Sequence, residues 1–355
     1  MSRFIQLHLL TAYPPANLNR DDQGSPKTAK MGGYDRLRVS SQCLKRTWRT
    51  SDIFEEAVSG HLGTRTKLLG LEIYKQLDAN GIKQKDAVEW AKVIAGVFGA
   101  SKKVKKDNPL AELEIEQLVH VSPAERFAIN TLTEKLIAEN RAPEKDELNL
   151  LRLQQQAVDI ALFGRMLASS PAFNIEAACQ VAHAISVHPV VIEDDYFTAV
   201  DDLNNKQEDT GAAHIGETRF AAGLFYSYIC INRDLLNKNL DGDQELANKA
   251  IRALTEAAVK VAPQGKQNSF ASRAYASYVL AELGDQQPRS LSVAFLKPIT
   301  LKDSNQDYIL DSIQALTKQK NAFDQVYGAC ADAQFELNVP QLQGSLPALL
   351  DFITQ

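Results

Sequence analysis

The sequence predicts an α+β fold in which a core of strands and helices is interrupted by a helical insertion and by a long β-hairpin. Three observations predict this class. Strand-like segments lie near the start, the middle and the end of the chain without alternating regularly with helices. Between residues 61 and 167 the segments have the amphipathic period of helices. Two segments rich in β-branched and aromatic residues then flank a polar connection. A chain of 355 residues has room for a domain with a substantial insertion.

The first part of the chain predicts two strands and a helix. Residues 1–10 alternate in polarity, which is typical of a strand and not of a signal peptide, because no basic segment precedes a long apolar run. Residues 36–39 alternate in the same way. Ser40 and Ser41 can then cap a helix, whose apolar side follows from the helical spacing of Leu44, Trp48, Phe54 and Val58.

The next part predicts a block of helices. Amphipathic helices are expected over 61–80, 84–99 and 109–120, and a further one over 146–167. The clearest start is at Ser122, because Pro123 follows it and Glu125 completes a Ser-x-x-Glu capping box. This helix should reach about Asn140.

The last part predicts the hairpin and the rest of the core. A helix over 174–188 should stop before Pro189, and strands over 190–203 and 219–232 should flank the connection 204–217. A helix over 243–262, a strand over 290–296 and helices over 306–322 and 341–353 complete the chain. This order favours a ferredoxin-like, RRM-related core with two insertions.

Composition excludes several classes of protein. No apolar run approaches the ~20 residues that span a bilayer, so we expect a cytoplasmic protein without membrane contact. The four cysteines form no CxxC pair, which argues against a disulfide framework or a zinc knuckle. His183 and His188 lack acidic or thiol neighbours at the usual ligand spacing. No metal or other cofactor is therefore predicted.

A cationic segment is the main candidate for function. Residues 20–49 carry eight Lys or Arg against three Asp, whereas the whole chain has a net charge of −5. Cations interleaved with Ser, Gln, Asn and Gly suit a polyphosphate backbone, since they replace its counterions and supply short polar groups. Nucleic acid is the first hypothesis.

The predicted helix after Ser40 concentrates these cations. Lys45 and Arg49 are four residues apart and Arg46 lies nearby on the helix surface. The helix N-terminus, with the side chains of Ser40, Ser41 and Gln42, could hold a phosphate. The alternative is an ordinary cap followed by a solvated charged face.

Signatures of enzymes are missing. The sequence has no GxxxxGK[ST], no GxGxxG after a strand, no HExxH and no GxSxG. Two acidic pairs, Asp21-Asp22 and Asp201-Asp202, could bind Mg²⁺ for phosphoryl transfer. The stronger interpretation is that these residues cap turns or pair with Arg. We therefore predict that the protein is not an enzyme.

Several separated segments resemble one known family. Residues 17–46 read NLNRDDxGxPKxAxxGGxxRxRVSSQxLKR, and later segments agree in order: VDIALFGRM at 158–166, VAHAISVH at 181–188, YFTAVDDL at 196–203, AHIGETRFAAGLFY at 213–226 and PQGKQNSFA at 263–271. Together they resemble the CasC backbone subunits of type I-E CRISPR Cascade, an RNA-guided antiviral complex that surveys DNA. The segment 61–150 and the last 60 residues match poorly.

The resemblance implies a right-hand architecture. An RRM-like palm would comprise 1–60 and 171–355, a helical finger 61–170, and a thumb hairpin about 190–232. It implies a non-catalytic subunit, several copies of which stack head to tail along the guide RNA (crRNA) and present it to a target DNA strand beside other Cascade subunits. No cofactor is implied.

The resemblance also implies which residues contact RNA. Those expected at guide-RNA phosphates are Arg20, Lys27, Ser40, Gln42, Lys45, Arg46 and Arg49. Arg165 and Met166 match an apolar wedge beside the RNA, and Phe197 with Thr198 matches residues that cover a displaced base. His214, Lys266 and Gln267 match further RNA-side positions.

The match departs from the family at the DNA side. The family uses a lysine-rich finger helix, but residues 131–147 scatter Lys135, Arg141 and Lys145 among acidic residues. Lysines within 102–106 could substitute for it. Two other functions stay open: a related backbone subunit that cleaves target RNA with Asp21 and Mg²⁺, and a single-stranded RNA-binding protein that never oligomerises.

Overall fold

The computed structural model describes residues 2–102, 109–153, 156–199, 214–300 and 307–355. The chain forms two compact units. Unit 1 comprises Met1–Phe54, Gln180–Ile231 and Ile251–Gln355, and unit 2 comprises Glu55–Cys179 and Asn232–Ala250. The insertion expected over 61–170 falls inside unit 2, which extends further at both ends and takes in a later segment.

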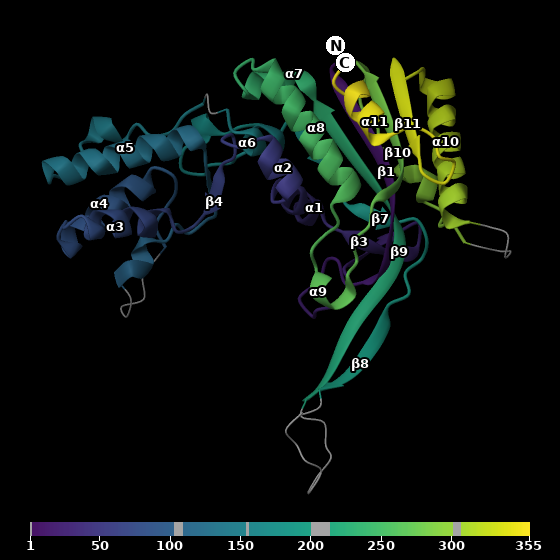
Figure 1. Cartoon of the computed structure of the whole chain (residues 1–355), viewed down its shortest axis with the longest axis horizontal. Helices are drawn as coiled ribbons and strands as arrows, with labels where there is room; N and C mark the ends of the chain where they lie inside the picture. Colours follow the sequence, from purple (N-terminus) through teal and green to yellow (C-terminus); the bar gives the residue numbers. More distant parts are fainter. Residues whose placement is uncertain (1, 103–108, 154–155, 200–213, 301–306) are drawn as a thin grey trace, which may run out of the picture. The chain divides into compact units, whose positions relative to one another are not determined.

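Unit 1 is built on a sheet with the order β11-β10-β1-β9-β7-β3-β2, drawn in Figure 1. The strands are β1 (Phe4–Ala16), β2 (Thr28–Met31), β3 (Tyr34–Val39), β7 (Ala184–Ser186), β9 (His214–Asn232), β10 (Ala276–Gly284) and β11 (Ala333–Asn338), with β6 (Cys179–Val181) and β8 (Glu193–Ala199) also paired to β9. β1 and β10 run antiparallel, with Phe4 opposite Gly284. The predicted α+β class is therefore confirmed.

Helices cover this sheet. Unit 1 contains α1 (Ser41–Arg49), α9 (Gln267–Phe270), α10 (Tyr308–Tyr327), α11 (Leu346–Phe352) and the 3₁₀ turn η4 (Ser292–Phe295), while α2 (Asp52–Ala57) and α8 (Gln244–Lys260) span the boundary of the units. Leu316 of α10 and Phe295 of η4 pack with Tyr278 and Leu280 of β10 and with Leu10 of β1, which forms a hydrophobic cluster on one face of the sheet. Among the described helices, none has the length and apolar character of a membrane span.

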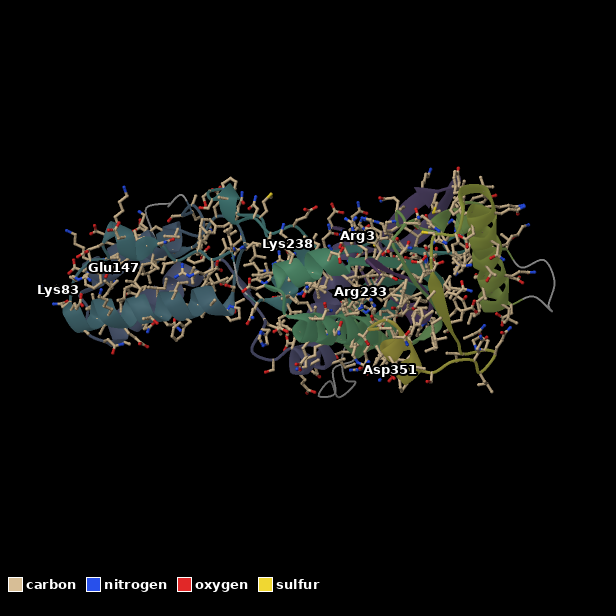
Figure 2. The ribbon with its side chains drawn as sticks, turned by 90° about the horizontal axis from the view of Figure 1, so that it is seen from above. Arg3, Lys83, Glu147, Arg233, Lys238 and Asp351 are labelled. Carbon is tan, nitrogen blue, oxygen red and sulfur yellow. The ribbon has the colours of Figure 1, made fainter. Side chains whose placement is uncertain are left out.

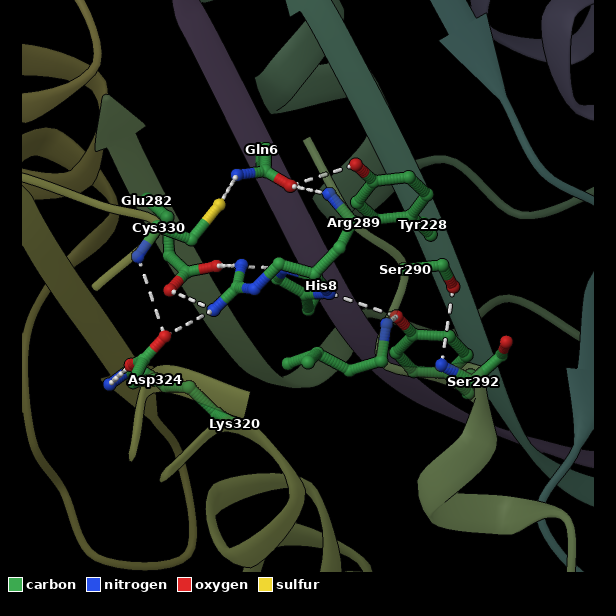
Figure 3. Close-up of polar contacts among 12 residues, drawn as sticks. Gln6, His8, Tyr228, Glu282, Arg289, Ser290, Ser292, Lys320, Asp324 and Cys330 are labelled. Atoms are coloured by element: carbon green, nitrogen blue, oxygen red, sulfur yellow. Dashed lines mark hydrogen bonds and ion pairs between the residues drawn. The ribbon is translucent and has the colours of Figure 1, made fainter. Parts of the chain in front are cut away.

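A buried polar network ties the sheet of unit 1 to the turn before η4, as Figure 3 shows. His8 contacts the Tyr226 hydroxyl through Nδ1 at 2.9 Å and Glu282 through Nε2 at 3.1 Å. Arg289 pairs with the same Glu282 and with Asp324. Burial lowers the pKa of His8, so the ring is neutral, donates from Nε2 and accepts the tyrosine proton at Nδ1. Burial opposes ionisation of Glu282, but hydrogen bonds from His8 and Arg289 lower its pKa to about 2.

Unit 2 is mainly helical. It contains α3 (Leu69–Ala79), α4 (Gln84–Gly96), α5 (Pro123–Glu139), α6 (Val158–Phe163), α7 (Arg233–Asn239), the short strand pair β4 (Thr64–Thr66) and β5 (Val119–Val121), and 3₁₀ turns η1 (Pro109–Leu113), η2 (Lys145–Leu148) and η3 (Pro171–Phe173). Its core includes Ile73, Trp90 and Leu136. The capping box is confirmed, because Glu125 N donates to Ser122 Oγ and Ser122 N donates to Glu125. Lys83, which precedes α4, is labelled in Figure 2.

Four predicted elements are wrong. The region 109–120 is a 3₁₀ turn and a strand, and the described residues of 146–167 hold only η2 and the short α6. The helix expected over 174–188 is replaced by β6 and β7, and the strand expected over 290–296 by η4. In each case a short apolar run is buried by long-range packing, and periodicity cannot identify the element that results. The strands β10 and β11 were not predicted.

The hairpin is present. β8 (Glu193–Ala199) pairs antiparallel with β9, from Glu193 opposite Phe220 to Ala199 opposite His214. β9 is longer than the predicted strand 219–232. β8 begins at Glu193 rather than at 190, and residues 200–203 of that predicted strand lie outside the described residues. The part of the predicted connection from 204 to 213 lies outside the described residues, and so do Asp201 and Asp202.

Candidate nucleic-acid interface

The loop between β1 and β2 is folded by its own polar side chains. The Asn17 side chain is fully buried and donates to the Gly24 carbonyl at 2.9 Å. One oxygen of Asp21 accepts from the backbone N–H groups of Gln23 and Ser25, both at 2.9 Å. This bonding closes a turn that exposes Arg20 and half-exposes Lys27. The hydrogen bonds of the loop thus fix the backbone that presents its cations, and we call residues 17–27 the cationic loop.

The start of α1 follows directly. Ser40 has extended backbone and its Oγ accepts from Cys43 N at 3.3 Å, which confirms the predicted N-cap. Ser41 N is already bonded to His183 Nδ1 at 3.1 Å. The helix N-terminus therefore offers fewer open N–H groups than the sequence suggested, and Gln42 is the exposed side chain beside it. Ser40 itself is buried, which favours a capping role.

The cations of this segment divide into two kinds. Arg36 is fully buried and donates to the carbonyls of Ser186 and Phe295, each at 2.8 Å. Burial lowers its pKa below the usual value. By contrast, no carboxylate of the described residues lies within ion-pair distance of Arg20, Lys27 or Arg46. These surface cations are open to an anionic ligand, whereas Arg36 holds strand β3 in place.

Lys45 and Arg49 lie on α1 with half-exposed side chains, and Arg46 between them is exposed. Leu44 and Trp48 of the same helix are buried. The predicted division of α1 into a basic face and an apolar face is confirmed. Ser40 N donates to Asn19 Oδ1 at 3.0 Å, so α1 begins directly beside the cationic loop.

Lys266 and Gln267 lie far away in sequence but on the same unit. Lys266 has a left-handed backbone at φ 47°, and its Nζ donates to Thr218 Oγ1 of β9. A side chain at Gly265 would overlap the carbonyl oxygens of Leu18 and Asn17, 2.3 and 2.6 Å from a Cβ. Only glycine allows this close approach. The fold thereby brings the Lys266 loop against the cationic loop.

The hairpin places an aromatic ring on the same side as Lys266. Phe197 is 44% exposed and its ring covers Gly216, where a Cβ would lie 2.3 Å from the ring. Phe197 lies opposite Gly216 and Thr218 lies opposite Asp195, so Phe197 and Thr218 are two register positions apart on the same face of the hairpin. Lys266 bonds that same Thr218. The aromatic ring and the contact of the Lys266 cation thus lie on one face of the hairpin, two register positions apart.

Thr198, predicted beside Phe197, is exposed on β8. His214 begins β9, but its side chain is outside the described part of the structure. Three contributors were missed by the sequence reasoning: Asn17, His183 and Arg219, which donates to Asp194 and to Ser25 Oγ. Only their partners, distant in sequence, reveal them.

In unit 2, Arg165 and Met166 differ in exposure, although they are adjacent in the sequence. Met166 is 79% exposed. Arg165 is buried and pairs with the fully buried Glu125 at 2.7 Å. Arg165 also donates to the His120 carbonyl at 3.3 Å. The structure therefore gives Arg165 an internal role and leaves Met166 as the surface residue of the pair.

The cations of unit 2 that could face DNA are largely neutralised. Arg141 pairs with Glu139 and Glu147, Lys135 pairs with Glu147, and Lys102 pairs with Glu114 at 3.0 Å. Hydrogen bonds from Arg141, from backbone N–H of Glu144 and from Lys135 lower the pKa of Glu147, so these pairs persist in mild acid. Lys103, Lys105 and Lys106 lie outside the described residues.

The alternative in which Asp21 binds Mg²⁺ and cleaves RNA has no cluster of metal ligands to support it among the described residues. Its carboxylate serves the turn, and within the described ranges no group of three His, Cys, Asp or Glu is placed to hold a metal ion. The four cysteines are free.

These features define a class: an antiparallel α+β protein with a shaped cationic surface beside an aromatic hairpin. The chain belongs to the CT1975-like protein family, which its sequence matches over residues 5–346. No curated protein matches the sequence.

Two solved structures cover nearly the whole chain. A chain described as "CRISPR RNA-guided surveillance complex, pre-nicking" matches with a TM-score of 0.82 and 28% identity, over 99% of both chains. Another, described as "CRISPR RNA-guided surveillance complex", matches with a TM-score of 0.73 and 25% identity, again over 99% of both chains. The similarity therefore includes both units.

Proposed function

We propose that this protein is a non-catalytic backbone subunit that binds guide RNA in a type I-E CRISPR Cascade complex. Several copies would stack along the RNA and present it for pairing with target DNA in the cytoplasm. The observation that carries the proposal is the match over 99% of both chains to a subunit of an RNA-guided surveillance complex. The cationic surface of unit 1 supports it independently.

The chemistry proposed for unit 1 is phosphate binding. Arg20, Lys27 and Arg46 replace counterions along the RNA backbone, because no carboxylate among the described residues neutralises them. Gln42 and Gln267 add polar contacts of fixed direction. Since phosphates carry no base information, guides of any sequence should bind equally.

The hairpin would hold one displaced base. Phe197 presents an exposed ring two register positions from the Lys266 contact, so a base can stack on the ring while its phosphate meets the ammonium group. Thr198, His214 and Met166 remain proposed RNA contacts on the strength of the family resemblance. The RRM-like palm is likewise a proposal that rests on the sheet and on that resemblance.

We propose a non-catalytic subunit because one carboxylate oxygen of Asp21 already accepts two backbone N–H groups of its own turn. A cleaving subunit would need that carboxylate on Mg²⁺. Replacing Asp21 and Asp22 by Asn tests this point. If the wild-type complex cuts complementary RNA in Mg²⁺ and the variant does not, the cleaving alternative is correct.

The deciding experiment is to co-express the full chain with its companion subunits and a guide transcript. The complex is then purified without adding RNA. We expect an RNA-containing particle whose protein copy number rises when the guide is lengthened. Sedimentation and nuclease protection measure copy number and protected length. A particle of fixed size on guides of every length would contradict the filament, and a free subunit without RNA would contradict the function.

A further inference from the structure

The root of the hairpin is clamped between two loops that are distant in sequence. On one face, Lys266 bonds Thr218 and the ring of Phe270 lies 5.8 Å from that of Phe220. On the other face, Arg219 reaches toward the cationic loop that contains Ser25. Alternate residues of β9 thus face different loops.

The guanidinium of Arg219 makes one contact within the hairpin and one to the cationic loop. Its Nε donates to Asp194 of β8 at 3.0 Å, and its Nη1 donates to Ser25 Oγ at 3.0 Å. Asp194 and Arg219 are directly opposite each other in the hairpin register. The guanidinium therefore joins both hairpin strands to one residue of the loop.

The backbone of Arg219 makes a third link. Asn17, fully buried, donates to the carbonyl oxygens of both Arg219 and Gly24 at 2.8 and 2.9 Å. Ser25 is itself fixed, because its N–H donates to Asp21. Movement of the hairpin root would be transmitted to the turn that presents Lys27.

We propose that Arg219 is a positioning residue for RNA binding: it locks the hairpin root to the cationic loop so that both meet the RNA in one geometry. This inference rests on the proposed function. It assigns no RNA contact to Arg219, whose donors are aimed at Asp194 and Ser25. This contact should raise the affinity for RNA, because a loop that is not held in place would have to be ordered during binding.

Lysine cannot replace this contact. Its ammonium group keeps the charge but lacks the planar fork that reaches Asp194 and Ser25 together. Arg219→Lys therefore separates positioning from charge, and Ser25→Ala removes one end of the link without changing any charge. The matched control is Arg252→Lys, because Arg252 of α8 pairs with Asp351 in the same unit at similar exposure.

The experiment measures binding of a labelled single-stranded RNA to the full-length protein at several salt concentrations. We expect Arg219→Lys and Ser25→Ala each to weaken binding about five- to tenfold with an unchanged salt slope, and the double variant to be no weaker than Arg219→Lys. Arg252→Lys should bind like wild type. Wild-type affinity for Arg219→Lys, with a reduced slope for Arg219→Ala, would overturn the proposal and make Arg219 an RNA contact.

Hydrogen exchange of the RNA-free protein tests the lock without the proposed function. We expect faster exchange of backbone amides in residues 18–27 in Arg219→Lys than in Arg252→Lys. Unchanged exchange overturns the positioning role. Faster exchange in a protein that binds no RNA would leave the lock standing and sink the proposed function instead.

Discussion

The two units carry their positive charge differently. In unit 1, Lys27 and Arg46 have no carboxylate partner among the described residues. In unit 2, Lys135 and Arg141 share Glu147, and Arg165 is buried against Glu125. A cation already paired gains less from a phosphate than an open one, because its ion pair must first be broken. Charge content alone therefore does not separate the two units, whereas the pairing of each cation does.

The largest expected effect is on stability and comes from Arg165, the buried paired cation of unit 2. We expect Arg165→Leu to lower the free energy of unfolding by about 3–5 kcal/mol, because Glu125 would stay buried with an uncompensated charge. Denaturant unfolding of the full chain measures this. The control is Arg126→Leu, which removes a surface pair with Glu72 and should cost at most about 1 kcal/mol. Equal losses would mean that Arg165 is not the internal anchor of unit 2.

The next largest effect should come from the open cations of unit 1. Lys27→Ala with Arg46→Ala should lower the slope of log K against log salt by about 1.4, at about 0.7 for each lost single-strand phosphate contact. Titrations of labelled RNA at several salt concentrations measure the slope.

The control for this pair removes two paired cations of the same unit. Arg252 bonds Asp351, labelled in Figure 2, and Lys260 bonds Glu256. Arg252→Ala with Lys260→Ala should leave the slope unchanged. A slope that falls equally in both double variants would show that only total charge matters.

Removing the carboxylate partners of the unit 2 cations should make these cations as open to phosphates as those of unit 1. Glu139→Gln with Glu144→Gln and Glu147→Gln removes the carboxylates beside Lys135 and Arg141 while keeping their size. We expect tighter binding of duplex DNA and a slope steeper by up to about 1.8, from two added contacts. If Lys135→Ala with Arg141→Ala weakens DNA binding in the wild-type background, these cations are not neutralised by their pairs.

Local signals in the sequence predicted part of this arrangement. Ser40 and Ser122 cap helices as predicted because a cap depends on neighbours within three residues. Arg36, Arg165 and Arg219 could not be assigned in the same way. Arg36 bonds Ser186, 150 positions away, so nothing near it distinguishes a buried arginine from a phosphate-binding one. The same limit applies to β10, because its Tyr278 and Leu280 are buried against Leu10 of β1 and Leu316 of α10, neither of which is near them in the sequence.

The smallest expected effect concerns His183, which lies beside the cations of unit 1. Its Nδ1 accepts from Ser41 N, and burial together with repulsion from Arg38 and Lys27 lowers its pKa below 6.5. The ring is therefore neutral at pH 7. Because the unfolded chain binds the proton first, this site should lose stability as the pH falls below about 6.5.

RNA should shift the same equilibrium in the opposite direction. A phosphate near His183 favours the protonated ring, so guide RNA should bind slightly more tightly at pH 5.5 than at pH 7, and the gain should vanish in His183→Asn. Titration of labelled RNA at both pH values measures it, with His61→Asn in unit 2 as the control. A gain that survives in His183→Asn would place the responsible proton elsewhere, and a gain lost in His61→Asn would contradict the assignment of RNA binding to the open cations of unit 1.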